Sequence, residues 1–481
     1  MNRLSHLLLV LVELLFITGN FSAQCYDKDF SDYLNRFYHV KNVPSVSAGV
    51  LKDDRIIFSK SIGYADLENF VKADENTIYR IASISKMITA VAVMQLVEKG
   101  KINLDEDIRT YIPYFPKKKW KVTTRQLLNH TSGIRNYRNG EFESTKYFTS
   151  IREAINVVSS DSLRFKPGTQ FLYSSLSYNL LAGITEAVSG TNFNQYLKEN
   201  IFLPAEMYNT YPDIQHDIIR HRARGYEVNE LGEIQNAPLA DLSIKYPGGG
   251  YISTVTDLLR FASALLQNKL ISKASLDTMM VKTKLNNGST INYGLGVSVE
   301  QDQYNRIYIS HAGTGTGFSS LLVIYPVERI AAVHLINIKR RIYDSPALQL
   351  ASIALGSGYS PPLISIADYL LKLYKPGKID SVISALDLII DDSSDVYSIS
   401  TDELSQFGHG LIRINRIYDA IIYFRYISDT FPDYSGALTG LADAYLKDGN
   451  RGMALKHFRL ALKINPADQY AAEMIRKITS H

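Results

Sequence analysis

The stretch Tyr79–Ala90, reading YRIASISKMITA, constrains the fold of this chain more than any other part of it. It places Ser83 three residues before Lys86, directly ahead of the run MITAVAVMQLV at Met87–Val97. A helix that is apolar on most of its sides belongs inside a domain. The sequence therefore predicts a buried helix whose first turn carries a serine and a lysine.

The spacing of these two residues indicates a possible nucleophile and its base. Residues i and i+3 share one face of a helix, so the Lys86 amine can reach the Ser83 hydroxyl. Burial disfavours the charged form of lysine, and a serine attacks well only when a nearby base takes its proton. The alternative is that Ser83 simply caps the helix. Ser83–Lys86 is the only Ser-x-x-Lys in the sequence, which favours the chemical interpretation.

Length and composition predict a soluble protein of two or three domains. The chain has 481 residues, of which 46% are hydrophobic and 21% charged, as in globular proteins with a large core. The net charge of +4 is small and gives no sign of nucleic-acid binding. Cys25 is the only cysteine, which excludes an intramolecular disulfide and a cysteine-based metal site. We expect neither a metal nor a cofactor.

The N-terminus resembles a secretory signal peptide, which we place at residues 1–23. A short basic start precedes the mostly apolar run Leu7–Ile17, and Phe21–Ala23 offers a cleavage site. The apolar part is too short to span a membrane. The sequence predicts a periplasmic or secreted protein of a bacterial envelope. A lipoprotein anchored through Cys25 is the alternative, but Gln24 is large for a residue before a lipidated cysteine.

The residues after the signal peptide indicate an α+β domain over residues 24–358. Strand-like runs flank a polar turn within residues 44–64, and helical patterns follow them. Further strands are expected at Tyr293–Val299, Ile307–Ser310, Ser319–Tyr325 and Ile330–Asn337. Hairpins at both ends with helices between them predict an antiparallel sheet flanked by helices. The Gly- and Pro-rich segment Gly356–Pro362 reads as a linker.

Residues 363–481 are predicted to form an all-α repeat domain. Six pairs of similar residues recur at a spacing of 34, namely Leu404 and Leu438, Phe407 and Leu441, Gly408 and Ala442, Ala420 and Ala454, Phe424 and Phe458, and Pro432 and Pro466. Small residues, aromatic residues and a closing proline in this order resemble the tetratricopeptide repeat. The resemblance implies that this domain binds a partner protein, or that it docks on the hydrolase domain and limits access to its cleft.

Two further segments carry candidate site residues. Tyr173 follows the turn Lys166–Thr169 and is expected to begin a helix that ends near Gly190, where its phenol could relay a proton. The segment Ile309–Pro326, reading ISHAGTGTGFSSLLVIYP, contains glycines that would let a substrate backbone approach closely. It lacks the Lys-Ser or Lys-Thr pair of a phosphate-binding loop.

In combination and order, these motifs resemble the serine β-lactamase and D-Ala-D-Ala peptidase superfamily, which includes penicillin-binding proteins. Ser-x-x-Lys is followed by Tyr-Ser-x before a helix and by His-x-Gly before a strand, as in the class C-like, esterase-type branch. LLNHTSGI (Leu127–Ile134), GGGYISTVTDLLRF (Gly248–Phe261) and YGLG (Tyr293–Gly296) match as well. The resemblance covers roughly residues 40–340 and implies a site between a helical part and the sheet.

The resemblance also implies roles for individual residues. Ser83 would be the acylated nucleophile, Lys86 its proton acceptor, and Tyr173 a proton shuttle to the leaving group. The backbone N–H groups of Ser83 and Thr314 would form the oxyanion hole. The residues expected to contact the substrate are Ser175, His311 and Gly313.

This sequence departs from the family pattern at two of those positions. Ser175 stands where the family's Tyr-x-Asn motif has its amide, and His311 stands where true β-lactamases carry a permanent cation. Histidine is mostly uncharged near neutral pH. Literal Tyr-x-Asn occurs at Tyr33–Asn35 and Tyr137–Asn139, but neither opens the expected helix, so we assign the family's motif to neither. These departures favour a peptidase or esterase over a β-lactamase.

The sequence therefore predicts a secreted serine hydrolase that forms an acyl-enzyme on small esters, amides or D-amino-acid peptides. The competing prediction is a non-catalytic or weakly active hydrolase-like domain that serves a tetratricopeptide adaptor. Substrate contacts are expected from the loops Asn136–Tyr147 and Tyr211–Leu242.

Overall fold

The computed structural model describes residues 27–230, 232–340, 344–391 and 395–480, so the predicted signal peptide and Cys25 lie outside the described residues. The chain divides into two compact units. The N-terminal unit comprises the chain up to Glu227 together with Asn236–Pro361, and the C-terminal unit comprises Val228–Gln235 and Pro362–His481. In the part of the chain that the structure describes, no helix is both long enough and apolar enough to cross a membrane.

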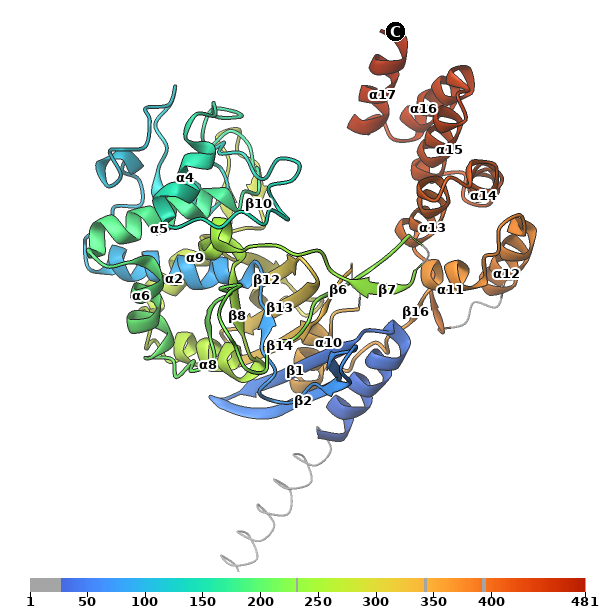
Figure 1. The fold of residues 1–481 in the computed structure, drawn as a ribbon. Coiled ribbons are helices and arrows are strands. Elements are labelled where there is room, and N and C mark those ends of the chain that lie inside the picture. The colour runs from blue at the N-terminus through green and yellow to red at the C-terminus, as the bar shows by residue number, and fades with distance from the viewer. Residues whose placement is uncertain (1–26, 231, 341–343, 392–394, 481) are drawn as a thin grey trace, which may run out of the picture. The chain divides into compact units, whose positions relative to one another are not determined.

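A seven-stranded antiparallel sheet forms the centre of the N-terminal unit (Figure 1). Its strands, in spatial order, are β11 (Ser298–Gln301), β12 (Ile307–Gly315), β13 (Phe318–Tyr325), β14 (Ile330–Ile336), β1 (Ser45–Lys52), β2 (Arg55–Asp66) and β3 (Val71–Lys72). Strand β1 pairs with β14, so the two ends of the unit meet in the middle of the sheet. The prediction of an α+β fold with an antiparallel sheet is confirmed.

Strand β11 begins later than the sequence predicts. The expected strand Tyr293–Val299 is wrong over its first half, because a turn replaces it: the Gly294 N–H donates to the Val297 carbonyl. Gly296 has a φ of 78°, a left-handed conformation that glycine adopts without strain. Strand β12 is longer than predicted and runs on to Gly315, which brings its glycines to the end of the sheet.

Helices cover both faces of this sheet. A Cβ at Gly49 would contact Val255 and Leu259 of α8 (Val255–Leu266). On β14, His334 accepts a hydrogen bond from the Ala347 N–H of α10 (Pro346–Ala354) at 3.2 Å. Gly49 pairs with the residue before His334, and successive residues of a strand point to opposite faces. Helices α8 and α10 therefore lie on opposite faces.

A helical part joins the α8 face. Its helices are α2 (Ile84–Glu98), α3 (Thr124–Leu128), α4 (Ile151–Ser159), α5 (Leu176–Ser189), α6 (Phe193–Leu197), α7 (Tyr246–Gly249) and α9 (Lys273–Met279). Helix α2 is buried from Ile84 to Leu96, as its apolar sequence predicts. The predicted helix start at Tyr173 is wrong: α5 begins at Leu176, since Ser174 turns its hydroxyl to accept the Ser177 N–H at 3.1 Å.

The C-terminal unit is helical, with α11 (Ile366–Leu373), α12 (Ile379–Asp391), α13 (Thr401–Arg413), α14 (Ile417–Thr430), α15 (Ser435–Lys447), α16 (Arg451–Ile464) and α17 (Gln469–Thr479). The pair α13–α14 and the pair α15–α16 have the same helix lengths and begin 34 residues apart. Phe424 is fully buried, and a Cβ at Gly408 or Gly440 would collide with its ring. Small residues are therefore required where these helices cross.

Candidate functional site

Ser83 and Lys86 meet at the start of α2. The Lys86 Nζ lies 3.0 Å from the Ser83 Oγ, 3.0 Å from the Ser175 Oγ and 2.5 Å from the Gly248 carbonyl. Lys86 is 0% exposed. Burial, together with the positive charge of Lys245, holds the pKa of Lys86 well below its usual range. The neutral amine is thus favoured directly beside the serine hydroxyl.

Ser83 follows a tight turn and does not use its side chain to cap the helix. Ser83 precedes α2, but its side chain makes no capping hydrogen bond. Ala82 has a φ of 44°, a left-handed conformation that is strained for a residue with a Cβ. The Ser85 hydroxyl donates to the Ala82 carbonyl at 2.7 Å and holds this turn. The alternative that Ser83 serves only as a helix cap receives no support from this geometry.

The Tyr173 phenol also reaches the serine. It lies close enough to Ser83 for the serine hydroxyl to influence its pKa, and its ring centroid lies 4.7 Å from the Lys86 Nζ. Burial raises the pKa of Tyr173 far above its usual value, so the phenol keeps its proton at neutral pH. His130 packs against the Tyr173 ring with a centroid distance of 4.3 Å. Ser83, Lys86 and Tyr173 therefore form one connected group of hydroxyls and an amine.

Ser175 occupies the position of the missing amide and contacts the same lysine. Besides its hydrogen bond with Lys86, Ser175 donates through its backbone N–H to the Asn136 side chain at 3.1 Å. Tyr137 lines the cavity beside Ser83. Tyr137–Asn139 opens no helix, so it does not take the place of the family's Tyr-x-Asn motif, and Tyr137 belongs to the loop Asn136–Tyr147 from which substrate contacts are expected. A loop that folds back onto α5 brings Tyr137 to the site.

The end of β12 forms the opposite wall. Thr314, Gly315 and Thr316 line the cavity beside Ser83. Strand β11 pairs with β12 only as far as Ser310, so the last residues of β12 have no strand partner on that edge within the described chain. In the same part of the chain, no group accepts a hydrogen bond from the Ser83 backbone N–H. The Ser83 N–H therefore remains available to a ligand.

Two of the residues expected to contact substrate lie behind this wall. His311 is 4% exposed and is not among the residues that line the cavity. Burial and the charge of Lys86 lower the pKa of His311 to about 3, so the ring is neutral. A Cβ at Gly313 would lie 2.5 Å from the Ile81 carbonyl oxygen, which is too close for any side chain. Gly313 thus serves the approach of β12 to the turn before Ser83.

His311 belongs to a chain of buried hydrogen bonds. The Ser174 N–H donates to the His130 Nδ1 at 3.2 Å, so the His130 Nε2 carries the proton and donates to the Tyr293 hydroxyl at 3.3 Å. The Tyr293 hydroxyl donates to the His311 Nε2 at 3.0 Å, and the His311 Nδ1 donates to the Ala312 carbonyl at 2.8 Å. This chain ties the loop before α5 to β12, and Tyr173 packs against it.

Comparison with known proteins places this arrangement in a family. The family model described as "Beta-lactamase" matches residues 30–353, about two thirds of the chain. This chain belongs to that family.

Among curated members of the family, the human mitochondrial serine beta-lactamase-like protein LACTB is 31% identical over 391 residues, covering 62% of this chain and 71% of LACTB. Penicillin-binding protein 4* of Bacillus subtilis is 32% identical over 325 residues, covering 64% of this chain and 71% of that protein. The octameric penicillin-binding protein homologue from Pyrococcus abyssi superposes with a TM-score of 0.60 at 24% identity, over 69% of this chain and 78% of its own. At this level of identity, the similarity to the Pyrococcus abyssi structure shows a shared fold and nothing more.

The motifs of the family do not disclose Lys245, which lines the cavity beside Ser83 together with Arg80, Thr314 and Thr316. Lys245 is 4% exposed, and its Nζ lies 4.0 Å from the centroid of the Phe142 ring while donating to the Phe142 carbonyl. Burial and the charge of Arg80 lower the pKa of Lys245 to about 7. The sequence offers one signal: Lys245 directly precedes the segment YPGGG, whose Gly248 backbone packs against Ser175.

The cavity beside Ser83 is narrow. Its volume is about 20 Å³, and the side chains of Phe142 and Leu242 form part of its lining. A space of this size accommodates about one water molecule. Phe142 and Leu242 belong to the two loops from which substrate contacts are expected, Asn136–Tyr147 and Tyr211–Leu242. In the portion of the chain that is described, no cluster of His, Cys, Asp and Glu could hold a metal ion.

Proposed function

We propose that the N-terminal unit is a serine hydrolase that works through an acyl-enzyme at Ser83. The observation that carries this proposal is the 3.0 Å contact between the Ser83 Oγ and the Nζ of a fully buried Lys86. A serine hydroxyl becomes a good nucleophile when an adjacent base accepts its proton. The depressed pKa of Lys86 favours the neutral amine that can serve as this base.

The three contacts of Lys86 match the needs of a neutral amine. Such an amine has two N–H bonds, which donate to the Gly248 carbonyl and the Ser175 hydroxyl. Its lone pair then accepts the proton from Ser83 as the Oγ bonds to the substrate carbonyl carbon. The carbonyl oxygen takes the negative charge of the tetrahedral intermediate, and the backbone N–H groups of Ser83 and Thr314 stabilise that charge.

Tyr173 completes the transfer. When the intermediate collapses, the bond to the leaving oxygen or nitrogen breaks, and the phenol donates its proton to that atom while the Lys86 ammonium reprotonates the phenol. The raised pKa of Tyr173 supports a role as donor, because the phenol is protonated before the step. Hydrolysis of the acyl-enzyme uses a water molecule and the same groups in reverse order.

The charges around the cavity support a substrate with a carboxylate. Lys245 and Arg80 line it together with Thr314 and Thr316, whereas His311 is neutral and set back from the wall. We propose small esters, amides or peptides that end in a D-amino acid as substrates, of the carboxypeptidase or esterase type.

A second candidate is a non-catalytic or weakly active domain that serves as a protein-binding adaptor. The specific observation in its favour is the narrow cavity, whose volume of about 20 Å³ holds no substrate without rearrangement. The intact contacts among Ser83, Lys86 and Tyr173 favour the enzyme.

The remaining parts of the chain extend the proposal. The 34-residue offset between α13–α14 and α15–α16 supports a tetratricopeptide-like array that binds a partner protein. The expected signal peptide at residues 1–23 would direct the protein to the periplasm or out of the cell, and lipidation of Cys25 would anchor it to a membrane. Assignment to the esterase-type branch remains part of this proposal.

Intact-mass spectrometry of the full-length protein tests the acyl-enzyme. After incubation with a p-nitrophenyl ester, a chromogenic cephalosporin or a D-alanyl-D-alanine peptide, we expect a mass increase equal to the acyl group for at least one of them. The variant Ser83→Ala should show none, and Ser59→Ala, which removes an exposed serine of β2, should label like the wild type. Labelling that persists in Ser83→Ala would contradict the assignment, and a complete lack of labelling in the wild type would favour the adaptor.

A further inference from the structure

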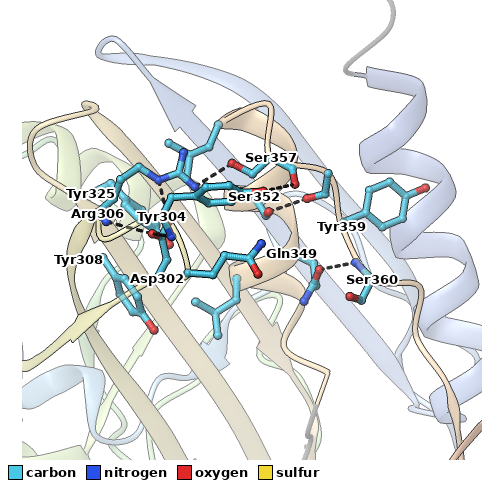
Figure 2. Close-up of a pocket in the computed structure, with 14 residues that line it drawn as sticks. Asp302, Tyr304, Arg306, Tyr308, Tyr325, Gln349, Ser352, Ser357, Tyr359 and Ser360 are labelled. Atoms are coloured by element: carbon cyan, nitrogen blue, oxygen red, sulfur yellow. Dashed lines mark hydrogen bonds and ion pairs between the residues drawn. The ribbon is translucent and has the colours of Figure 1, made fainter.

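A second and larger cavity lies in the N-terminal unit, away from Ser83. Its volume is about 520 Å³, and it is formed by the turn between β11 and β12, by α10 and by the segment that follows α10 (Figure 2). Tyr308 of β12 lines it, five residues before Gly313, whose missing Cβ faces the turn at Ile81. Residues an odd number apart point to opposite faces of a strand. The cavity therefore lies on the α10 face of the sheet, opposite Ser83.

The charges in this cavity cancel. Among the residues that line it, Asp302 and Arg306 are the charged ones, and the Arg306 Nε donates to the Asp302 Oδ2 at 2.7 Å. Arg306 also donates to the Ser357 hydroxyl at 2.7 Å, and Figure 2 shows it bridging these two residues. A free anion would meet Asp302 and a free cation would meet Arg306. The cavity is therefore suited to a ligand without net charge.

Aromatic rings form its flat surfaces. The rings of Tyr308 and Tyr325 lie with their centroids 5.0 Å apart and inclined by 33°. Tyr304 lies against the Arg306 guanidinium, whose central carbon is 4.8 Å from the ring centroid. The ring of Tyr359 is held perpendicular to Tyr33 at 5.6 Å. These contacts fix the rings in place before any ligand arrives, which reduces the entropy lost on binding.

Polar groups without partners accompany the rings. Tyr325 is 3% exposed, yet within the described residues its hydroxyl makes no hydrogen bond. That hydroxyl is not sealed off from solvent, and the residue lines the cavity. The Gln349 Oε1 accepts the Ser360 N–H at 2.9 Å, which leaves the Gln349 NH₂ group for another acceptor. The Tyr325 hydroxyl and the Gln349 NH₂ group can therefore exchange solvent for hydrogen bonds with a ligand hydroxyl.

We propose that this cavity binds a neutral saccharide, as a mono- or disaccharide unit. A sugar ring is uncharged, presents an apolar C–H face to an aromatic ring, and carries hydroxyls that both donate and accept. The cavity offers tyrosine faces, the Tyr325 hydroxyl, the Gln349 amide and the paired Asp302 and Arg306. Its volume falls within the roughly 300–1,000 Å³ that is usual for small-molecule sites. The saccharide would bind without a covalent reaction. The assignment of this site is independent of acylation at Ser83.

Other ligand classes fit the cavity less well. A lipid chain needs an apolar lining, and here the aliphatic residues are Leu348 and Leu355. A metal needs a cluster of ligating side chains, which the described part of the chain lacks. A short neutral peptide would share the hydrogen-bonding needs of a saccharide but lacks its flat C–H face, and is therefore a competing outcome of the test.

Saturation-transfer NMR with the purified full-length protein tests this inference. The probes are N,N′-diacetylchitobiose, cellobiose and maltose, which separate an amino-sugar source from glucan sources, with the neutral peptide acetyl-Ala-Ala-amide as comparison. We expect saturation transfer to at least one disaccharide, strongest at its ring C–H protons. Transfer to the peptide alone, or to none of the probes, would overturn the proposal.

Two variants with a matched control locate the site. Tyr325→Phe keeps the ring and loses no internal hydrogen bond, so the protein should fold normally and its Kd should rise about 2- to 10-fold. Tyr308→Ala should abolish detectable transfer, with a thermal unfolding scan to show that the protein is folded. Tyr208→Phe, at an exposed tyrosine, should bind like the wild type. Binding that is unchanged in both Tyr325→Phe and Tyr308→Ala would contradict the assignment.

Discussion

Gly313 of β12 lies directly against the Ile81 carbonyl, and a Cβ on Gly313 would come within 2.5 Å of that oxygen. The Ser320 hydroxyl of the neighbouring strand donates to the same carbonyl at 2.9 Å. These contacts fasten the sheet to the turn in which Ala82 adopts a left-handed conformation just before Ser83. The position of the proposed nucleophile relative to the end of β12 thus depends on a glycine that does not line the cavity beside Ser83.

The first prediction concerns this contact. Gly313→Ala should destabilise the protein by about 1–3 kcal/mol, the usual range for overpacking, and lower its melting temperature. It should also slow acylation of Ser83, because β12 must move away from the turn. Ala312→Thr is the control, since residue 312 is exposed on the same strand and should change stability by less than about 0.5 kcal/mol. Equal stability of the two variants would show that the contact carries no constraint.

The second prediction separates the leaving-group step from nucleophilic attack. Tyr173→Phe removes the phenol that would protonate the leaving group but leaves Ser83 and Lys86 in contact. A p-nitrophenolate leaves without protonation, whereas an amine does not. We therefore expect kcat on an amide or peptide to fall about 10²- to 10⁴-fold, the range for general acid catalysis, and kcat on a p-nitrophenyl ester to fall far less. Steady-state kinetics on both substrates measure this, and an equal loss on both would assign Tyr173 to positioning.

The third prediction uses the pKa of Lys245, which burial lowers to about 7. Below pH 7 the ammonium is charged and attracts a carboxylate, and above pH 7 this attraction fades. The ratio of kcat/KM for a carboxylate-bearing ester to that for its methyl ester should therefore fall as pH rises through 7. In Lys245→Met this ratio should be about 10-fold lower at pH 6, because a charge-assisted hydrogen bond is lost, and should no longer depend on pH. Lys117→Met, in an exposed loop, is the control.

The same variant has a second effect that can be measured with a neutral ester. The charge of Lys245 is one cause of the lowered pKa of Lys86. Without that charge the protonated form of Lys86 is less disfavoured, so its pKa should rise. In Lys245→Met, the acid limb of the pH profile of kcat/KM for the neutral ester should then move to higher pH. A limb that moves to lower pH, or stays in place, would contradict the coupling of the two lysines.

Local sequence patterns predict the groups that lie along one element. Ser83 and Lys86 share one helical turn, and the apolar residues after them dictate a buried helix, so their contact follows from spacing. Tyr173 follows from the turn and helix beside it, although α5 begins three residues later than expected because Ser174 caps its first turn. The antiparallel sheet follows from the strand-like runs of β1, β2, β13 and β14, of which β1, β13 and β14 are buried along almost their whole length.

The sequence alone does not predict site residues that come together through contacts between distant segments of the chain. Tyr137 reaches Ser175 from a loop without regular structure, and Lys245 enters the site through a short helical turn before Gly248. The neutrality of His311 could be expected from its ordinary pKa, but its place behind the wall depends on hydrogen bonds to Tyr293 and Ala312. Likewise, no local pattern sets Val228–Gln235 apart from its surroundings as a part of the C-terminal unit.

The last prediction concerns the C-terminal unit. Gly440 of α15 has no room for a Cβ, because the Phe424 ring occupies that space, whereas a Cβ at Gly452 of α16 would meet only the Asn450 side chain at 3.9 Å. Both changes to alanine favour a helix by about 1 kcal/mol through propensity, so packing decides the difference. Gly440→Ala should lower the unfolding temperature of the C-terminal unit and Gly452→Ala should not. Calorimetry of the full-length protein, with acylation of Ser83 followed in parallel, measures both.

Because the N-terminal unit has its own core, acylation should persist after the C-terminal unit of Gly440→Ala has unfolded. Loss of both in one transition would show that the two units fold as one.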